Sequence, residues 1–342
     1  MTIILDAMGS DYFPKPEILA AAELQLLGED VLLVGNRQII NKNISELNLE
    51  NRSFQIHDAP DIVEMSDKPV ESARKKPNNS MAIGLQLVKE GAAEAFVTAG
   101  NTGAAYFNSV TILKRIDGIS RPALAAIIPV KNRKCVFLDT GANADCRPEF
   151  LLEFAVMGST YASKVFINPF PKVGLLANGE EAGKGNQLVK EAYLLLQKSG
   201  LNFIGNVEPK DIFSGSVDIV VADGFSGNVF IKSSEAVAKL IIDNLKTGLS
   251  SSPIRKIGYL LAKPAFQSLK KMLDPSETGA ALLLGVNGLV FIGHGRSDSK
   301  ALVSSVILAR NSITNNFLTT MKNEIQDKLI QSIKQDNESR AE

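Results

Sequence analysis

Glycine-rich turns that also carry Asn, Asp or Ser follow short apolar runs at five places in the sequence. Glycine lets backbone N–H groups approach an anion closely, and a following helix adds the positive end of its dipole. A single turn of this kind needs such residues merely to reverse the chain. Five together predict a phosphate site, built from residues 6–11, 98–104, 139–143, 178–186 and 223–228.

The candidate binding residues are the small and polar members of these turns. Lys184 lies between two glycines and can direct its ammonium group at an anion. The aspartates that end strands, Asp6, Asp139 and Asp223, could bind a metal or could equally cap the helices that follow. The phosphate- and substrate-binding candidates are Asp6, Gly9, Ser10, Gly100, Asn101, Thr102, Gly103, Gly141, Asn143, Gly185, Asp223 and Gly227.

Several familiar site patterns are incomplete in this sequence. Around Lys184 the glycines enclose three residues instead of four, and Gly185 stands where a P-loop needs Ser or Thr. The glycines of residues 293–298 lack the third member of a dinucleotide fingerprint, and there is no GxSxG. Two histidines are too few for most histidine-based metal sites. Cys135 is expected in the core, and a reactive thiol at Cys146 is the less favoured interpretation.

Composition narrows the class of protein. The 342 residues include 37 basic and 37 acidic side chains, so net charge gives no nucleic-acid signal. Two cysteines are too few for a disulfide framework and fit a reducing cytosol. The sequence enters a strand-like run at once, and no apolar stretch reaches about 18 residues. We therefore expect a cytoplasmic protein that neither is secreted nor spans a membrane.

Short apolar runs that alternate with helical patterns predict an α/β fold. Their continuous apolar character favours a sheet covered by helices on both faces, with ligands at the carboxyl ends of the strands. We expect a single domain over residues 1–325 and a frayed or disordered polar tail over 326–342. The expected strands are 2–6, 31–35, 54–57, 95–98, 124–129, 135–139, 173–176, 203–207, 219–222 and 289–293.

A basic segment interrupts this pattern at residues 246–275. No acidic residue occurs between positions 244 and 273. Pro253 is predicted to open one helix and Pro264 to separate it from a second, which gives an amphipathic hairpin. The hairpin is interpreted as a landing surface for anionic lipid or an acidic carrier protein, or as a stripe that packs on the body or a dimer mate. Its basic residues are Lys246, Arg255, Lys256, Lys263, Lys270 and Lys271.

In order, these motifs resemble the phosphate acyltransferase family of bacterial phospholipid synthesis, over about residues 1–315. The departures are Ser10, in place of a second glycine, and Thr140, in place of an apolar residue. The matching motifs include Leu5-Asp6-Ala7-Met8-Gly9, residues 98–104, Arg121-Pro122-Ala123-Leu124, Gly141-Ala142-Asn143, Gly179-Glu180-Glu181, Lys184-Gly185, Asp223-Gly224-Phe225-Ser226-Gly227-Asn228 and His294-Gly295.

The resemblance implies a homodimer with a three-layer α/β/α fold similar to isocitrate and isopropylmalate dehydrogenases and to phosphotransacetylases. It implies transfer of an acyl group from acyl carrier protein to inorganic phosphate, with Lys184 and Asn228 as catalytic residues and His294 at the substrate site. No cofactor or metal is implied. The further partners would be an anionic membrane surface, contacted through Arg255, Lys256, Lys263, Lys270 and Lys271, and the downstream membrane glycerol-3-phosphate acyltransferase.

Two alternatives remain open at this point. The same fold could carry a metal-dependent, NAD-linked decarboxylating dehydrogenase, which needs a carboxylate cluster and an adenosine site. A scaffold that binds acyl carrier protein or a membrane surface would form no acyl phosphate.

Overall fold

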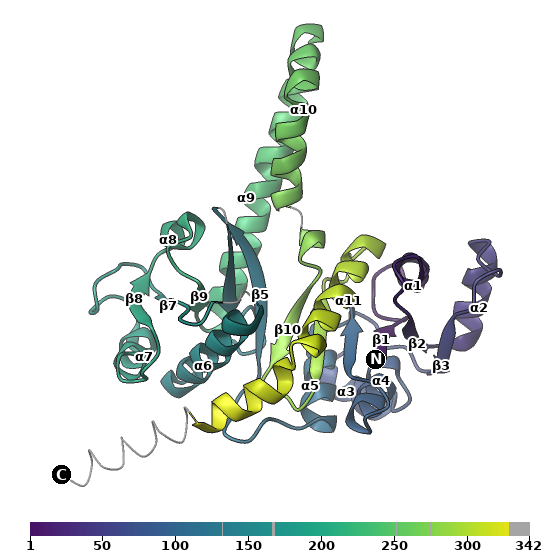
Figure 1. Cartoon of the computed structure of the whole chain (residues 1–342), viewed down its shortest axis with the longest axis horizontal. Helices are drawn as coiled ribbons and strands as arrows, with labels where there is room; N and C mark the ends of the chain where they lie inside the picture. The colour runs from purple at the N-terminus through teal and green to yellow at the C-terminus, as the bar shows by residue number, and fades with distance from the viewer. Residues whose placement is uncertain (132, 166–167, 251, 274, 328–342) are drawn as a thin grey trace.

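The computed structural model describes the chain except residues 132, 166–167, 251, 274 and 328–342. The expected tail therefore lies outside the described residues from position 328 onward. One mixed sheet of eleven strands runs through the molecule in the order β3-β2-β1-β4-β11-β10-β5-β6-β9-β7-β8 (Figure 1). The strands are β1 Ile3–Asp6, β2 Val31–Gly35, β3 Gln55–Asp58, β4 Ala95–Thr98, β5 Ala123–Val130, β6 Arg133–Leu138, β7 Val173–Leu176, β8 Phe203–Val207, β9 Ile219–Val221, β10 Ala280–Leu284 and β11 Leu289–Gly293.

Helices cover both faces of this sheet. Along β1, Ile3 and Leu5 pack on one face and Ile4 on the other, which is the period-two pattern of a strand buried on both sides. One layer contains α1, α2, α6, α7 and α11, and the other contains α3, α4, α5, α8 and α9. The expected three-layer α/β/α architecture is confirmed. The helices are α1 Lys15–Leu26, α2 Arg37–Glu46, α3 Pro69–Lys75, α4 Ser80–Lys89, α5 Thr102–Ile112, α6 Pro148–Val165, α7 Gln187–Gln197, α8 Pro209–Ser214, α9 Gly224–Ser250, α10 Pro253–Leu273 and α11 Ser299–Thr314.

The strands reverse direction in the middle of the sheet. Strands β1, β2, β3, β4 and β11 are mutually parallel, whereas β10 is antiparallel to β11, β5 to β10, and β6 to β5. Strands β7, β8 and β9 follow the direction of β6. The carboxyl ends of β1, β4 and β11 therefore lie at one end of the strands, and those of β6, β7 and β9 lie at the other.

Strand β10 was absent from the sequence-based prediction. It is a short apolar run that forms an antiparallel pair with β11, with Leu282 opposite Phe291. Such a run carries no helix after it, so it does not show the alternation of strand and helix from which the other strands were recognised.

Helices α9 and α10 form an antiparallel pair that projects far from the sheet (Figure 1). Pro253 opens α10, and the Ser252 hydroxyl accepts a hydrogen bond from the Arg255 N–H (3.3 Å), so this part of the prediction is confirmed. The predicted break at Pro264 is wrong, because Pro264 lies inside α10. Proline removes one helical N–H donor, but both Pro264 and Leu260, whose carbonyl loses that donor, are exposed, so water can satisfy the carbonyl.

Candidate functional site

The carboxylate of Asp139 organises the turn that follows β6. It is fully buried and accepts hydrogen bonds from five N–H groups. Its Oδ1 accepts from the backbone of Leu124 (3.0 Å), Gly141 (3.2 Å) and Ala142 (3.1 Å). Its Oδ2 accepts from Asn143 through the backbone (2.7 Å) and the amide side chain (2.9 Å). Burial raises the pKa of Asp139 and the N–H donors oppose that shift. Asp139 therefore fixes the turn and is not available as a surface ligand.

The N-terminus of α9 packs directly on this turn. The Gly224 N–H donates to the Asn143 carbonyl (2.7 Å). A Cβ on Gly227 would lie 1.9 Å from the Asp139 carbonyl oxygen, so only glycine permits this approach. Asn228 is exposed, and its amide nitrogen lies 3.1 Å from the position that a Cβ on Gly141 would occupy. The close packing thus places the Asn228 amide beside the turn, at the surface.

Asp223 caps the same helix. Its Oδ1 accepts from the Ser226 N–H (2.8 Å) and its Oδ2 from the Ser226 hydroxyl (2.8 Å). Of the two roles that the sequence left open for Asp223, the structure shows the helix cap.

Lys184 lies on the loop after β7, at the same end of the strands as Asn228, because β7 and β9 are parallel neighbours. The loop is closed by the Gly185 N–H, which donates to Asn178 Oδ1 (2.9 Å), and by the Lys184 N–H, which donates to the Glu181 carbonyl (2.9 Å). The Lys184 side chain is exposed, and no carboxylate of the described residues lies within 4.0 Å of its ammonium group. Its charge is available to an anionic ligand.

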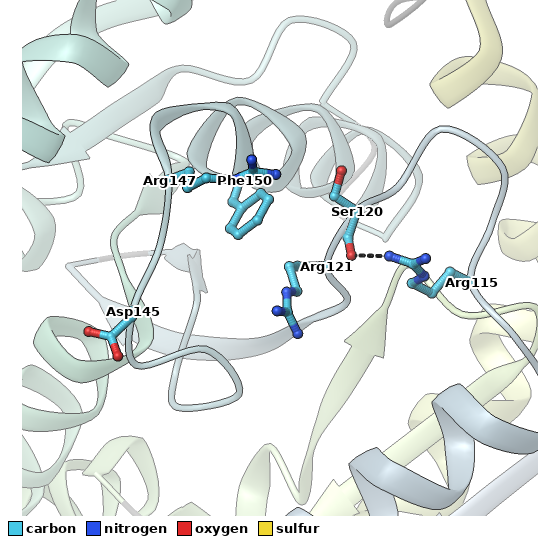
Figure 2. Close-up of a pocket in the computed structure, with 6 residues that line it drawn as sticks. All are labelled: Arg115, Ser120, Arg121, Asp145, Arg147 and Phe150. Atoms are coloured by element: carbon cyan, nitrogen blue, oxygen red, sulfur yellow. Dashed lines mark hydrogen bonds between the residues drawn. The ribbon is translucent and has the colours of Figure 1, made fainter.

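A pocket of about 650 Å³ with three arginines opens beside the Asp139 turn (Figure 2). The guanidinium carbon of Arg147 lies 4.7 Å and that of Arg121 5.9 Å from the centre of the Phe150 ring. The third arginine, Arg115, donates to the Ser120 carbonyl. Sequence reasoning missed this pocket because the arginines come from two separate segments. The available signal was that Arg121 comes just before β5 and Arg147 just after the turn that follows β6, so two arginines lie close to the hairpin of these strands in the sequence.

The remaining candidate residues lie at the opposite end of the strands. Asp6, the last residue of β1, accepts a hydrogen bond from the hydroxyl of Thr98 (2.6 Å). The Gly100 N–H donates to the same hydroxyl (2.9 Å). Asn101 caps α5, and His294 Nε2 lies 3.5 Å from Glu235 Oε1. Because of the strand reversal, these residues do not join the Asp139 group within one chain. The residues at this end are Asp6, Gly9, Ser10, Gly100, Asn101, Thr102, Gly103 and His294, and those at the Asp139 end are Gly141, Asn143, Lys184, Gly185, Asp223, Gly227 and Asn228.

Buried acids occupy the interior behind β1. Glu17 is completely buried on α1 and accepts a hydrogen bond from the Ser10 N–H (3.1 Å). Burial raises the pKa of Glu17 to about 7, and it also raises the pKa of Asp6. Ser10 is only 2% exposed, so its hydroxyl belongs to the interior in this structure.

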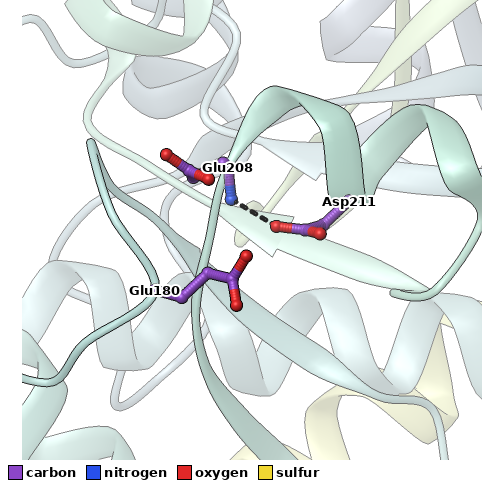
Figure 3. A group of neighbouring side chains, drawn as sticks. All are labelled: Glu180, Glu208 and Asp211. Carbon is purple, nitrogen blue, oxygen red and sulfur yellow. Dashed lines mark hydrogen bonds between the residues drawn. The ribbon is translucent and has the colours of Figure 1, made fainter.

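Three neighbouring carboxyl groups, those of Glu180, Glu208 and Asp211, have oxygen atoms within 4.8 Å of one another (Figure 3). Glu208 and Asp211 form the capping box of α8, in which Asp211 accepts from the Glu208 N–H (2.9 Å). Lys210 Nζ lies 2.8 Å from Glu180 and 2.6 Å from Glu208, which neutralises much of their charge. The cluster is explained by helix capping and ion pairing.

Solved structures with this fold include phosphotransacylases. The phosphotransacetylase from Streptococcus pyogenes is 20% identical and has a TM-score of 0.59, with 98% of this chain and 94% of that chain covered. A branched-chain phosphotransacylase from Enterococcus faecalis is 13% identical, with a TM-score of 0.58 and coverage of 92% and 99%. A putative 4-hydroxythreonine-4-phosphate dehydrogenase from Salmonella typhimurium is 14% identical, with a TM-score of 0.55 and coverage of 91% and 99%. These likenesses define the fold class, which transferases share with dehydrogenases.

Sequence relatives define the family. A family model described as "Fatty acid synthesis protein" matches residues 1–320. The phosphate acyltransferase of Elusimicrobium minutum is 43% identical over 329 residues, covering 96% of both chains. That of Pelotomaculum thermopropionicum is 43% identical over 330 residues, covering 95% of both. The chain belongs to the phosphate acyltransferase family and is an enzyme of the transferase class.

The buried carboxyl of Glu17 makes stability depend on pH. Its pKa is about 7 in the folded protein against an ordinary 4.5, so the folded state holds an extra proton between these values. This stabilisation is fully present below about pH 4.5 and is lost as pH rises through about 7. Relative to Glu17→Gln, the free energy of unfolding of the wild type should fall by about 3 kcal/mol across that window.

Urea unfolding at several pH values measures this difference, with Glu23→Gln on the exposed face of α1 as the matched control. A difference between wild type and Glu17→Gln that stays constant from pH 4.5 to 8 would show that Glu17 does not titrate as described.

Proposed function

We propose that this chain transfers a fatty acyl group from acyl carrier protein to inorganic phosphate and releases acyl phosphate, an early step of phospholipid synthesis. The observation that carries the proposal is the gathering of Lys184, Asn228 and the Asp139 turn at one end of the strands, in a chain whose family relationship extends over nearly its full length. Lysine, amide and backbone N–H groups are the donors that phosphate binding requires.

The reaction needs positioning and charge stabilisation more than acid–base machinery. An oxygen of hydrogen phosphate attacks the thioester carbon, the C–O bond forms, the C–S bond breaks, and the carrier thiolate leaves and takes up the proton that the phosphate loses. Lys184 offers a positive charge to the phosphate, and the Asn228 amide offers N–H donors to the oxyanion that develops on the thioester carbonyl. This scheme uses no histidine, cofactor or metal.

Asp139 has a positioning role in this scheme. By accepting both backbone and side-chain N–H groups of Asn143, it fixes the turn on which α9 begins. The turn and the glycine contact at Gly227 hold Asn228 in place, so the oxyanion donor is set before the substrates arrive.

Cys146 is unsuited to act as a covalent nucleophile. Its thiol donates to the Asn143 carbonyl (3.4 Å), and burial raises its pKa to about 12. A thiol with such a pKa is protonated at neutral pH, whereas the thiolate is the nucleophile. The proposed transfer therefore proceeds directly in a ternary complex of enzyme, acyl carrier protein and phosphate. Cys135 is fully buried, as expected of a core residue.

The α9–α10 hairpin, Gly224–Leu273, supports a peripheral association with the inner face of the membrane. Ile254 is 82% and Leu261 80% exposed, so these apolar side chains do not pack on the body of the chain. Arg255, Lys256 and Lys263 accompany them on α10. The positions of Lys270 and Lys271 also fall on α10, but their side chains lie outside the described residues. No helix in the described part of the chain combines the length and apolar character needed to cross a bilayer.

The proposed setting is a cytoplasmic homodimer that receives acyl chains from acyl carrier protein and delivers acyl phosphate to the membrane glycerol-3-phosphate acyltransferase. Incubation with acyl carrier protein thioester and phosphate, followed by hydroxylamine trapping, tests the activity. A scaffold would give no phosphate-dependent hydroxamate above the amount that the thioester itself forms with hydroxylamine, and a dehydrogenase of the same fold would instead reduce NAD⁺ when Mg²⁺ and a hydroxy acid are supplied.

Replacement of Lys184 or Asn228 by Ala should lower turnover by about 10²–10³ while the fold is retained, because both side chains are exposed on the surface at the site. Hydroxamate formation measures the rate and circular dichroism checks the fold. Lys190→Ala, an exposed lysine on neighbouring α7, is the matched control and should remain active. A folded variant that keeps more than about a tenth of the wild-type rate would remove its residue from the proposed mechanism.

Cys146→Ser should retain turnover and sequential kinetics, because the transfer passes through no acyl-cysteine. Initial rates at varied phosphate and acyl carrier protein thioester measure the kinetic pattern. Parallel lines in the double-reciprocal plot, together with an acylated Cys146 peptide from quenched turnover, would overturn direct transfer.

Charge reversal on α10 should release the enzyme from anionic vesicles, because each basic residue near such a surface contributes roughly 1 kcal/mol. The variant carries Glu at Arg255, Lys256 and Lys263, and co-sedimentation with phosphatidylglycerol vesicles is measured at low and high salt. A control with Glu at Lys89, Lys190 and Lys198, exposed lysines outside the hairpin, has the same net charge and should still bind. Equal binding by both variants would contradict a membrane role for the hairpin.

A further inference from the structure

A second cavity adjoins the arginine pocket. It has a volume of about 320 Å³ and shares Arg115, Ser120 and Arg121 with the larger pocket of about 650 Å³. Both volumes fall within or near the range of about 300–1,000 Å³ that is common for ligand pockets. The two cavities therefore form neighbouring compartments, joined at the segment that carries Arg115 and Arg121.

The larger compartment is cationic. Arg115, Arg121 and Arg147 line it together with a single acidic residue, Asp145 (Figure 2). Within the described part of the chain, no carboxylate oxygen lies within 4.0 Å of the three guanidinium groups. Phe150 holds Arg121 and Arg147 beside its ring and neutralises neither of them. Two arginines without acidic partners suit a phosphate group, which guanidinium groups bind through paired, charge-assisted hydrogen bonds.

The smaller compartment is mainly apolar. Its wall on α5 is formed by Tyr106, Phe107 and Val110, and Pro122 contributes from the opposite segment. Tyr106 and Val110 are four residues apart and so share one face of the helix. Arg121 and Tyr106 both line this compartment, and burial raises the pKa of Tyr106, so its hydroxyl stays protonated at neutral pH. An aliphatic chain fits such a wall, with the polar groups gathered at the junction of the two compartments.

Both compartments lie beside the segment of the Asp139 turn. The carbonyl of Pro122, which lines the smaller compartment, accepts a hydrogen bond from the Asn143 side chain (2.8 Å). Asp145 and Arg147 follow the Asp139 turn directly in the sequence, and Phe150 lies in the first turn of α6. A ligand that spans the two compartments therefore lies next to the Asp139 turn, on which the N-terminus of α9 and Asn228 pack.

We propose that these adjoining compartments bind a phosphate group attached to an aliphatic chain, with the phosphate on Arg121 and Arg147 and the chain along Phe107, Val110 and Pro122. The identification of that ligand as acyl phosphate rests on the proposed function. The same chemistry is present in the phosphopantetheine arm of a carrier-bound acyl group. The recognition chemistry, an anionic head beside an apolar tail, is common to both sources.

Isothermal titration of the full-length protein with dodecyl phosphate, below its micelle concentration, tests the site without turnover. Dodecanol and inorganic phosphate are titrated separately and should each bind at least tenfold more weakly than dodecyl phosphate. The variant with Gln at Arg121 and Arg147 should bind dodecyl phosphate at least tenfold more weakly. Phe107→Ala should also lower the affinity for dodecyl phosphate, because it removes a contact with the dodecyl chain and none with the phosphate. Arg74→Gln, an exposed arginine on α3, is the matched control and should bind as the wild type does.

Unchanged dodecyl phosphate affinity in the folded double arginine variant would overturn the proposal, as would equal affinity for dodecanol and dodecyl phosphate. Displacement of dodecyl phosphate by S-dodecanoyl-4′-phosphopantetheine, which carries both the phosphate and the chain, assigns the site to the carrier arm, and failure of that displacement assigns it to acyl phosphate. A wild type that binds dodecyl phosphate through the arginines but forms no hydroxamate would refute the proposed function and leave this site standing. Normal turnover by the wild type, together with unchanged dodecyl phosphate affinity in the double arginine variant, would refute this site and leave the proposed function standing.

Discussion

The buried carboxylate of Asp139 joins three segments that are distant in sequence. Through its own hydrogen bonds it holds the turn after β6 and the first residues of β5, and through Asn143 and the close approach of Gly227 it sets where α9 begins. A buried carboxylate is stable only if its oxygens are satisfied, and here every partner is a donor. The positions of Asn228 and of the arginine pocket both follow from this one arrangement.

The reversal of strand direction across β10, β5 and β6 divides the candidate residues into two groups. It places the turns after β1 and β4 at one end of the strands and the turns after β6, β7 and β9 at the other. In the first group, Asp6 is buried and accepts from the Thr98 hydroxyl, and Ser10 is buried beside Glu17, whereas Thr102 and His294 are exposed. The second group presents a lysine, an asparagine and arginines at the surface. The chemistry of the second group matches an anionic substrate, whereas that of the first group largely serves the fold within one chain.

The sequence was sufficient to predict most strands, the three layers and the identity of the family, because buried strands are continuous apolar runs and the motifs occur in a fixed order. Strand direction could not be predicted in this way, since it depends on partners far along the chain, as when Leu282 pairs with both Phe291 and Ala125. For the same reason Asp6 and Asp139 were expected at one site although they lie at opposite ends. Arg115 and Arg147 carry no local pattern, so their convergence emerged only from the folded chain. At Pro264 the error has a local cause. Proline usually ends a helix, but here the carbonyl that loses its hydrogen bond is exposed to water, so α10 continues through Pro264.

Helix α9 begins at the Asp139 turn, passes Glu235 beside His294 at the other end of the strands, and continues without interruption along α10. Its 27 residues span about 40 Å at 1.5 Å per residue. A continuous helix of this length fixes the distance between the Asp139 turn and the far end of α9. Any group that binds at the far end of α9 is therefore held at a set distance from Asn228, whatever the orientation of the rest of the molecule.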